Sequence, residues 1–171
     1  REYNQPKDFE SFVYVSQLLQ AEGMRKGFDA HLRNRPYCMG TLYWQLNDCW
    51  PVISWSSVDY YNRWKALHYF VRKAYEDILI SFEKTDDLVS VYIVSDRQDD
   101  FPATLSLKII DFNGKIKWQS ENQVDVSSQV SRIYSNVNIQ GISRTEHLLV
   151  AKLIDGDSVI AENLFYFLPA K

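Results

Sequence analysis

Apolar residues follow two different periods along the chain, and the period changes near residue 77. From residue 8 to about residue 32, apolar side chains recur every three or four positions, which predicts an amphipathic helix. Asp8 precedes this helix and can accept hydrogen bonds from the free amides of its first turn. A second helix is expected from about Asn62 onward, where apolar positions again share one stripe.

The segment between the two predicted helices is apolar and carries no charge over Pro36–Leu46. This composition predicts a strand buried on both faces, as in parallel sheets covered by helices. One helix, strand, loop and helix cannot close a sheet, so we expect partner strands outside this sequence. Within the first helix, Gly23 and Gly27 suggest a kink, an early end or close packing against a neighbour.

From Asp77 onward the apolar positions alternate, which predicts half-buried antiparallel strands. Asn113-Gly114 and Asp155-Gly156 stand between pairs of such strands and indicate two hairpins. Seven short strands fit an immunoglobulin-like β-sandwich. They are expected at residues 78–84, 88–95, 103–112, 115–123, 130–139, 146–154 and 158–167. We therefore predict two domains, 1–76 and 77–171.

The composition is that of a globular protein: 171 residues, 46% apolar and 24% charged, with a formal net charge of −3. Basic residues form no stripe that would favour nucleic acid or an anionic membrane. No apolar run approaches the roughly 18 residues that span a bilayer. Two cysteines and three scattered histidines suggest neither a disulfide framework nor a metal site. The first residue, Arg1, is not Met, so we expect a piece of a longer protein.

Seven aromatic residues lie from Tyr43 to Trp64, at the end of the predicted strand, in the loop after it and at the start of the second predicted helix. In sheets of this kind, ligands bind beyond the carboxyl ends of the strands. Trp44, Trp50 and Trp55 could stack on the apolar face of a sugar ring, or they could be core residues of a barrel rim.

Polar residues in and after the same loop have two interpretations each. Asn47 and Asp48 could bind sugar hydroxyls, or could be turn residues that bind their own backbone. His68 could be catalytic, but its position beside the apolar stripe of the second helix favours a structural role. Cys49 could be a nucleophile, but no neighbouring His or helix start would lower its pKa, so a small buried thiol is favoured.

Two stretches carry a family resemblance. Gly40–Tyr61, followed by Trp64–Tyr69, resembles the eighth-strand region of β-mannosidases in glycoside hydrolase family 2. Phe9–Gln17 resembles the helix that precedes it in those enzymes. The resemblance implies the last βα unit of a (β/α)8 barrel, joined to an immunoglobulin-like sandwich.

The resemblance also implies a function. These enzymes are exo-acting, retaining hydrolases that release terminal β-mannose by means of two glutamates. Both glutamates precede the matched region, so we expect no catalytic residue, metal or cofactor in this chain and no activity from the chain alone. Trp44 matches the tryptophan that lines the terminal mannose subsite, and Asn47, Asp48, Trp50 and Trp55 follow it. The peptide bond Trp44–Gln45 is expected to be cis, as is often found there in barrels of this type.

Two kinds of partner are expected. The first is β-mannoside oligosaccharides or glycans, bound by the longer enzyme of which this chain would be a part (the parent). The second is the upstream barrel residues of the same protein. The parent is expected outside the cytoplasm, in a bacterial periplasm, or in a lysosome. Two alternatives stay open. One is an exo-β-glucosaminidase of the same family, and the other is a noncatalytic sandwich that binds carbohydrate or serves as a scaffold.

Overall fold

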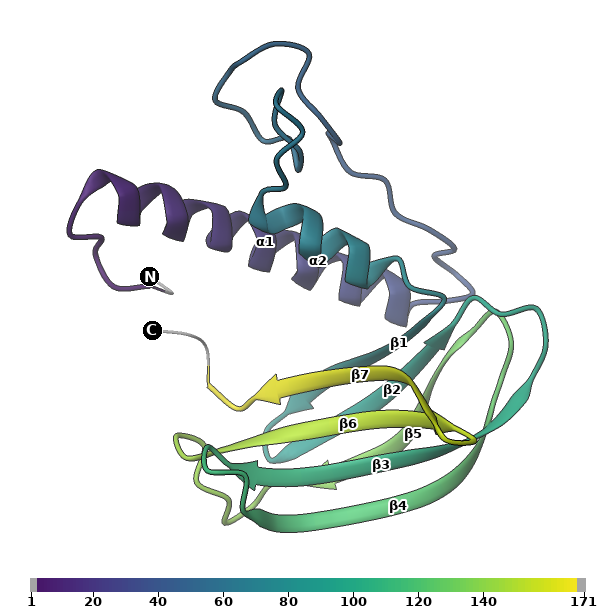
Figure 1. Ribbon diagram of the computed structural model, residues 1–171. Helices are drawn as coiled ribbons and strands as arrows, with labels where there is room; N and C mark the ends of the chain where they lie inside the picture. The colour runs from purple at the N-terminus through teal and green to yellow at the C-terminus, as the bar shows by residue number, and fades with distance from the viewer. Residues whose placement is uncertain (1–2, 169–171) are drawn as a thin grey trace. The chain divides into compact units, whose positions relative to one another are not determined.

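The computed structural model describes residues 3–168, which divide into two compact units (Figure 1). The first unit combines residues 3–32 with Cys38–Glu76, and contains both helices except Arg33, the last residue of the first helix. The second combines Arg33–Tyr37 with residues 77–168, and contains all seven strands of the described residues.

Helix α1 spans Phe9–Arg33, in agreement with the predicted helix. Asp8 caps it as expected: its Oδ1 accepts the Ser11 amide at 2.7 Å and its carbonyl accepts the Phe12 amide at 3.0 Å. The bond from Ser11 holds the pKa of the Asp8 carboxyl below its usual value. The helix continues through Gly23 and Gly27, so neither glycine ends it. Neither glycine packs closely against a neighbour, because a Cβ at either position would meet nothing within 4 Å.

Helix α2 spans Ala66–Ala74 and begins four residues later than the sequence suggested. The reason is a turn before it: Asn62 is left-handed, with φ 61°, and its amide bonds to the carbonyl of Asp59 at 3.0 Å. The two helices and the loop bury a small core whose ring contacts join Phe28 to Tyr43 and Tyr75. Its buried helical residues are Ala21, Phe28, Leu32, Leu67, Val71 and Ala74.

The predicted buried strand over Pro36–Leu46 is not formed. This segment has no regular structure, and Leu42 is 98% exposed. A strand needs a neighbour to take its backbone hydrogen bonds. Within residues 3–168 no other strand pairs with this segment, so the expected barrel unit does not appear here.

The second unit is the predicted immunoglobulin-like sandwich, with seven antiparallel strands in two sheets. One sheet has the order β1-β2-β5 and the other β4-β3-β6-β7. The strands are β1 Ile78–Thr85, β2 Leu88–Ser95, β3 Phe101–Asp111, β4 Ile116–Val126, β5 Ser131–Asn138, β6 His147–Asp155 and β7 Ser158–Tyr166. Each strand lies within two or three residues of its predicted bounds.

The sandwich core is built from the inward residues of both sheets, among them Ile80, Val91, Leu105 and Leu149. Both expected hairpins are present, since β3 pairs with β4 and β6 with β7. The Asn163 amide donates to the Ile80 carbonyl at 2.7 Å and thereby links β7 to β1. Backbone ladders and apolar burial together hold this unit.

Candidate functional site

Residues 44–65, called here the aromatic loop, fold back on themselves around Val58. The Val58 amide donates to the Leu46 carbonyl at 2.8 Å, and the Ser57 amide donates to the Gln45 carbonyl at 3.1 Å. The Lys65 amide then bonds to the Ser57 carbonyl at 2.9 Å, which ties the end of the loop to its middle. The Trp44–Gln45 peptide bond is cis, as expected.

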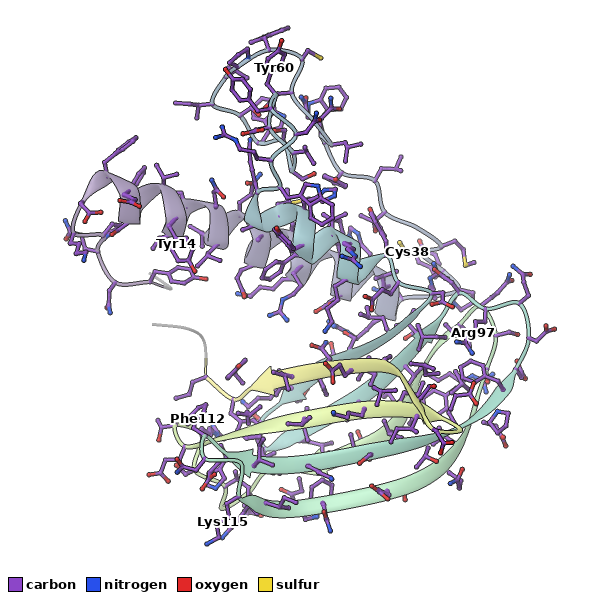
Figure 2. All side chains as sticks on the ribbon, in the orientation of Figure 1. Tyr14, Cys38, Tyr60, Arg97, Phe112 and Lys115 are labelled. Atoms are coloured by element: carbon purple, nitrogen blue, oxygen red, sulfur yellow. The ribbon has the colours of Figure 1, made fainter. Side chains whose placement is uncertain are left out.

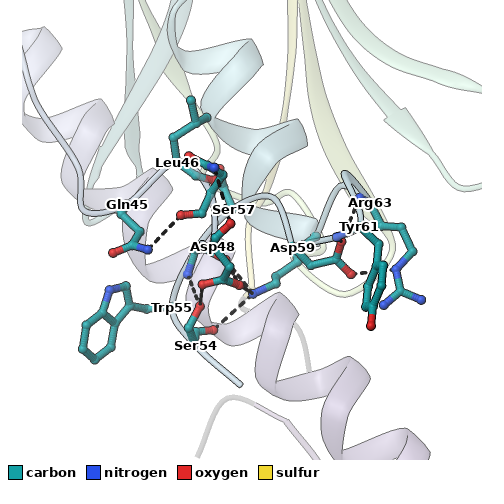
Figure 3. Close-up of polar contacts among 12 residues, drawn as sticks. Gln45, Leu46, Asp48, Ser54, Trp55, Ser57, Asp59, Tyr61 and Arg63 are labelled. Atoms are coloured by element: carbon teal, nitrogen blue, oxygen red, sulfur yellow. Dashed lines mark hydrogen bonds and ion pairs between the residues drawn. The ribbon is translucent and has the colours of Figure 1, made fainter. Parts of the chain in front are cut away.

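A carboxylate lies at the centre of this loop (Figure 3). Asp48 is only 5% exposed, and its two oxygens accept hydrogen bonds from Ser54 Oγ at 2.6 Å and Ser56 Oγ at 2.7 Å. Lys65 Nζ lies 3.5 Å from Asp48 Oδ2 and donates to Ser56 Oγ at 2.8 Å. We call these four residues the Asp48 cluster.

The Asp48 cluster favours the ionised carboxyl. The hydroxyls of Ser54 and Ser56 lower the pKa of Asp48, with a smaller contribution from the charge of Lys65, and these effects outweigh the opposing effect of burial. Because Ser56 donates its only hydroxyl proton to Asp48, it is free to accept one from Lys65. The cluster is therefore a satisfied polar network that connects three parts of the loop.

A second network fixes the loop to α2. Ser57 is fully buried, and its hydroxyl donates to the Leu46 carbonyl at 3.0 Å. Tyr43 Oη lies 2.8 Å from the same hydroxyl and His68 Nδ1 3.1 Å from it. Since Ser57 has one proton to give, Tyr43 and His68 act as donors to it. His68 thus has the structural role that its sequence position favoured.

The three candidate tryptophans remain exposed although the loop is ordered by these bonds. Trp44 is 76% exposed, Trp50 65% and Trp55 60%. The Trp55 carbonyl accepts a hydrogen bond from Gln20 Nε2 of α1 at 2.8 Å, so its backbone is anchored while its indole is not. Within residues 3–168 these indoles are surface groups rather than core residues.

The two polar candidates differ. Asn47 is exposed, and its amide makes only a long bond of 3.5 Å to the Asp48 carbonyl. Asp48 points inward, where Ser54, Ser56 and Lys65 occupy its oxygens. These three partners could not be predicted from the sequence, because scattered serines and a lysine in a loop carry no distinctive spacing.

The described residues hold no group of three or more His, Cys, Asp and Glu side chains that could bind a metal ion. Cys38 is half-buried and Cys49, expected to be buried, is exposed; both are free thiols. Neither α1 nor α2 is long and apolar enough to cross a membrane.

Comparisons with known proteins identify the sandwich. Residues 87–171 match the model of the mannosidase Ig/CBM-like domain. Rat β-mannosidase is 36% identical over 109 residues, which cover 59% of this chain and 12% of that protein. β-Mannosidase B of Aspergillus fumigatus is 29% identical over 174 residues, covering 89% of the chain and 21% of the relative. The chain thus spans only a small part of the curated relatives it matches.

Solved structures agree with this identification. The β-D-mannosidase of Dictyoglomus thermophilum matches 98% of this chain with a TM-score of 0.90 and 28% identity, over 21% of its own length. An exo-chitosanase of Amycolatopsis orientalis matches 96% of the chain, and 20% of its own, with a TM-score of 0.74 and 24% identity, a likeness of fold alone. The chain therefore belongs to the β-mannosidases of glycoside hydrolase family 2, in the region that contains their Ig-like domain.

Proposed function

We propose that this chain is part of a longer β-mannosidase, called here the parent enzyme, which releases terminal β-mannose with retention of configuration. In this proposal the aromatic loop forms one wall of the sugar site, and the sandwich is a scaffold. We assign the two catalytic carboxyls to the remainder of the parent, because the resemblance implies that both glutamates precede the matched region. Retaining glycosidases need such a pair about 5 to 5.5 Å apart.

One observation carries the proposal: Trp44, Trp50 and Trp55 stay exposed on a loop that is ordered by backbone hydrogen bonds around Val58 and by the bonds of its central carboxylate. An exposed indole buries the apolar face of a sugar with little loss of side-chain entropy, because it has few rotatable bonds. A loop that is ordered before binding avoids the cost of ordering it afterwards. Trp44, Trp50 and Trp55 are the proposed stacking groups, and Asn47 is the proposed hydrogen-bonding group.

Asp48 has a different part in the proposal from the one the sequence suggested. Its oxygens are already occupied by Ser54, Ser56 and Lys65. We therefore assign it to positioning the loop rather than to binding sugar hydroxyls directly.

The test is Trp44→Ala in the parent enzyme, assayed with 4-nitrophenyl β-mannoside. Loss of the platform should misplace the reacting sugar and lower kcat/KM by roughly 100-fold. The melting temperature should change little, because Trp44 lies on the surface. Trp118→Ala is the matched control, since it removes a half-exposed indole from the sandwich and should leave kcat/KM unchanged.

Wild-type kcat/KM in Trp44→Ala, together with a lower melting temperature, would mean that Trp44 is a packing residue. A parent that hydrolyses the β-glucosaminide in place of the β-mannoside would point to the related exo-β-glucosaminidase activity. The isolated 171-residue chain should hydrolyse neither substrate above background, because the proposal assigns its catalytic groups to the remainder of the parent.

A further inference from the structure

Strand β4 forms one edge of the four-stranded sheet, and its backbone is paired on one side only. Its 11 residues pair with β3, and within residues 3–168 no strand pairs with its other side. In Figure 2, Lys115 marks the turn that leads into this outermost strand. A long strand with an unpaired edge is a template on which another strand can form a backbone ladder.

The inner face of β4 is also less covered than the inner face of β3. Trp118 stands opposite Ile109, and Asn122 stands opposite Leu105, so the members of each pair face the same side of the sheet. Ile109 is 1% exposed and Leu105 is fully buried, whereas Trp118 is 38% exposed and Asn122 is exposed. The opposing sheet thus covers β3 and leaves much of β4 uncovered. An added strand beside β4 would bury more of the Trp118 indole.

The outer face of β4 carries charges of both signs. Lys117 and Glu121 are four residues apart and therefore lie on the same face as Gln119. Ser106 Oγ donates to Glu121 Oε1 at 3.1 Å, but in the described part of the chain neither Lys117 nor Glu121 has an ion-pair partner. Among the edge strands β1, β4, β5 and β7, only β4 has both signs of charge on one face.

We propose that β4 pairs antiparallel with β4 of a second copy of this chain, in a symmetric dimer centred on Gln119. A two-fold axis at Gln119 puts Lys117 of each copy opposite Glu121 of the other, which makes two complementary pairs. The same axis puts the two Trp118 side chains in diagonal positions, within reach of each other's rings. The pairing joins the two four-stranded sheets into one and satisfies both unpaired edges.

The charges of β4 select both the register and the occupant. The strand has three charged residues, Lys117, Glu121 and Asp125. An axis at Glu121 would pair Lys117 with Asp125, but it would also place Glu121 opposite itself. The axis at Gln119 is the one register that pairs opposite charges of β4 and places no like charges opposite each other. A second copy supplies the complementary charges by symmetry, whereas an unrelated strand has no such constraint.

Sedimentation equilibrium of the 171-residue chain tests the dimer. A small interface with exposed ion pairs is weak, so we expect a dissociation constant on the order of 100 µM. Lys117→Glu and Glu121→Lys should each raise this constant about tenfold or more, because each makes both facing pairs repulsive. Glu146→Lys is the matched control: it changes the net charge as Glu121→Lys does, at an exposed position outside β4, and should leave the constant unchanged.

Mixing the two single variants separates lost pairing from lost folding. In a mixed dimer of Lys117→Glu and Glu121→Lys, opposite charges face each other again at both pairs, so the mixture should dimerise about as well as the wild type. Single variants that dimerise as well as the wild type would overturn the proposal. So would a mixture that stays monomeric although circular dichroism shows both variants folded.

The wild-type chain gives a second test that needs no substitution. The amides on the free edge of β4 should exchange with solvent more slowly at about 1 mM protein than at about 10 µM, because dimerisation pairs them. The amides of β6, which is paired on both sides, should exchange at the same rate at both concentrations. A chain that stays monomeric at about 1 mM, or β4 exchange that does not depend on concentration, would reject the edge as a dimer interface.

Discussion

In the sandwich, regular backbone ladders and a core of alternating apolar residues hold seven strands. The aromatic loop contains no strand. Two networks of side-chain hydrogen bonds, centred on Asp48 and Ser57, order it instead. The sandwich buries a continuous apolar core, whereas the loop buries a carboxylate and two serines and leaves its four tryptophans exposed. A region that must bind a ligand can use hydrogen bonds for order and keep its apolar groups free.

The largest effect should come from the sandwich core. Leu105 on β3 is fully buried, so Leu105→Ala should lower the free energy of unfolding by about 2–5 kcal/mol. Four of the five tryptophans lie in residues 44–64, and their native fluorescence should not change, because the loop is ordered by its own bonds. Chemical denaturation followed by circular dichroism, with native-state fluorescence, separates the two effects. A variant that also changes the loop fluorescence would argue that the loop depends on the sandwich.

The sequence predicted the strands of the sandwich correctly and a strand over Pro36–Leu46 wrongly. One physical reason explains both outcomes. Alternating residues and the Asn113-Gly114 turn encode strands locally, because each strand's partner is nearby in this chain. The apolar segment Pro36–Leu46 encodes a buried strand whose partners the described residues do not supply, so it stays irregular and exposed. A pattern of residues specifies an element only where the neighbours that complete it are present.

Within the candidate site, the sequence pointed to the exposed groups and missed the supporting ones. Tryptophans after an apolar segment are a visible signal, and Trp44, Trp50 and Trp55 are indeed exposed. Asp48 was expected to bind sugar hydroxyls or its own backbone, but its environment depends on Ser54 and Ser56, which come together only when the loop folds back. Folding back depends on pairing around Val58, and hydrophobic periodicity does not report such pairing.

Lowering the pH should have a smaller effect, a loss of stability of the folded aromatic loop. The pKa of Asp48 is below its usual value of 3.8, so its ionised form stabilises the folded loop above pH 3.8. This stabilisation is lost as the pH falls below 3.8 through the lower pKa of the folded state. Tryptophan fluorescence should therefore change over that acid range. The change should be reduced in Asp48→Asn, while an acid transition identical in the variant would show that other carboxyls cause it.

The smallest effects concern two glycines that differ only in backbone conformation. A Cβ at Gly23 or at Gly114 would meet nothing within 4 Å, yet Gly114 has φ +84° and Gly23 lies inside α1. Gly114→Ala should destabilise the sandwich by about 1–2 kcal/mol, because the left-handed region disfavours a Cβ. Gly23→Ala should stabilise α1 by about 1 kcal/mol. Thermal unfolding followed by circular dichroism gives the direction of each change in stability. A change in the same direction for both substitutions would contradict this account.

The central claim is that the Asp48 cluster orders the aromatic loop independently of the sandwich, and amide hydrogen exchange of Asp48→Asn tests it most directly. The amides of Ser57, Val58 and Lys65, which bond within the loop, should exchange roughly tenfold faster than in the wild type, as expected when a hydrogen bond to a charged group is lost. The amides of β3 and β6 should exchange at unchanged rates. Equal acceleration in both regions, or no change in the loop, would contradict the claim.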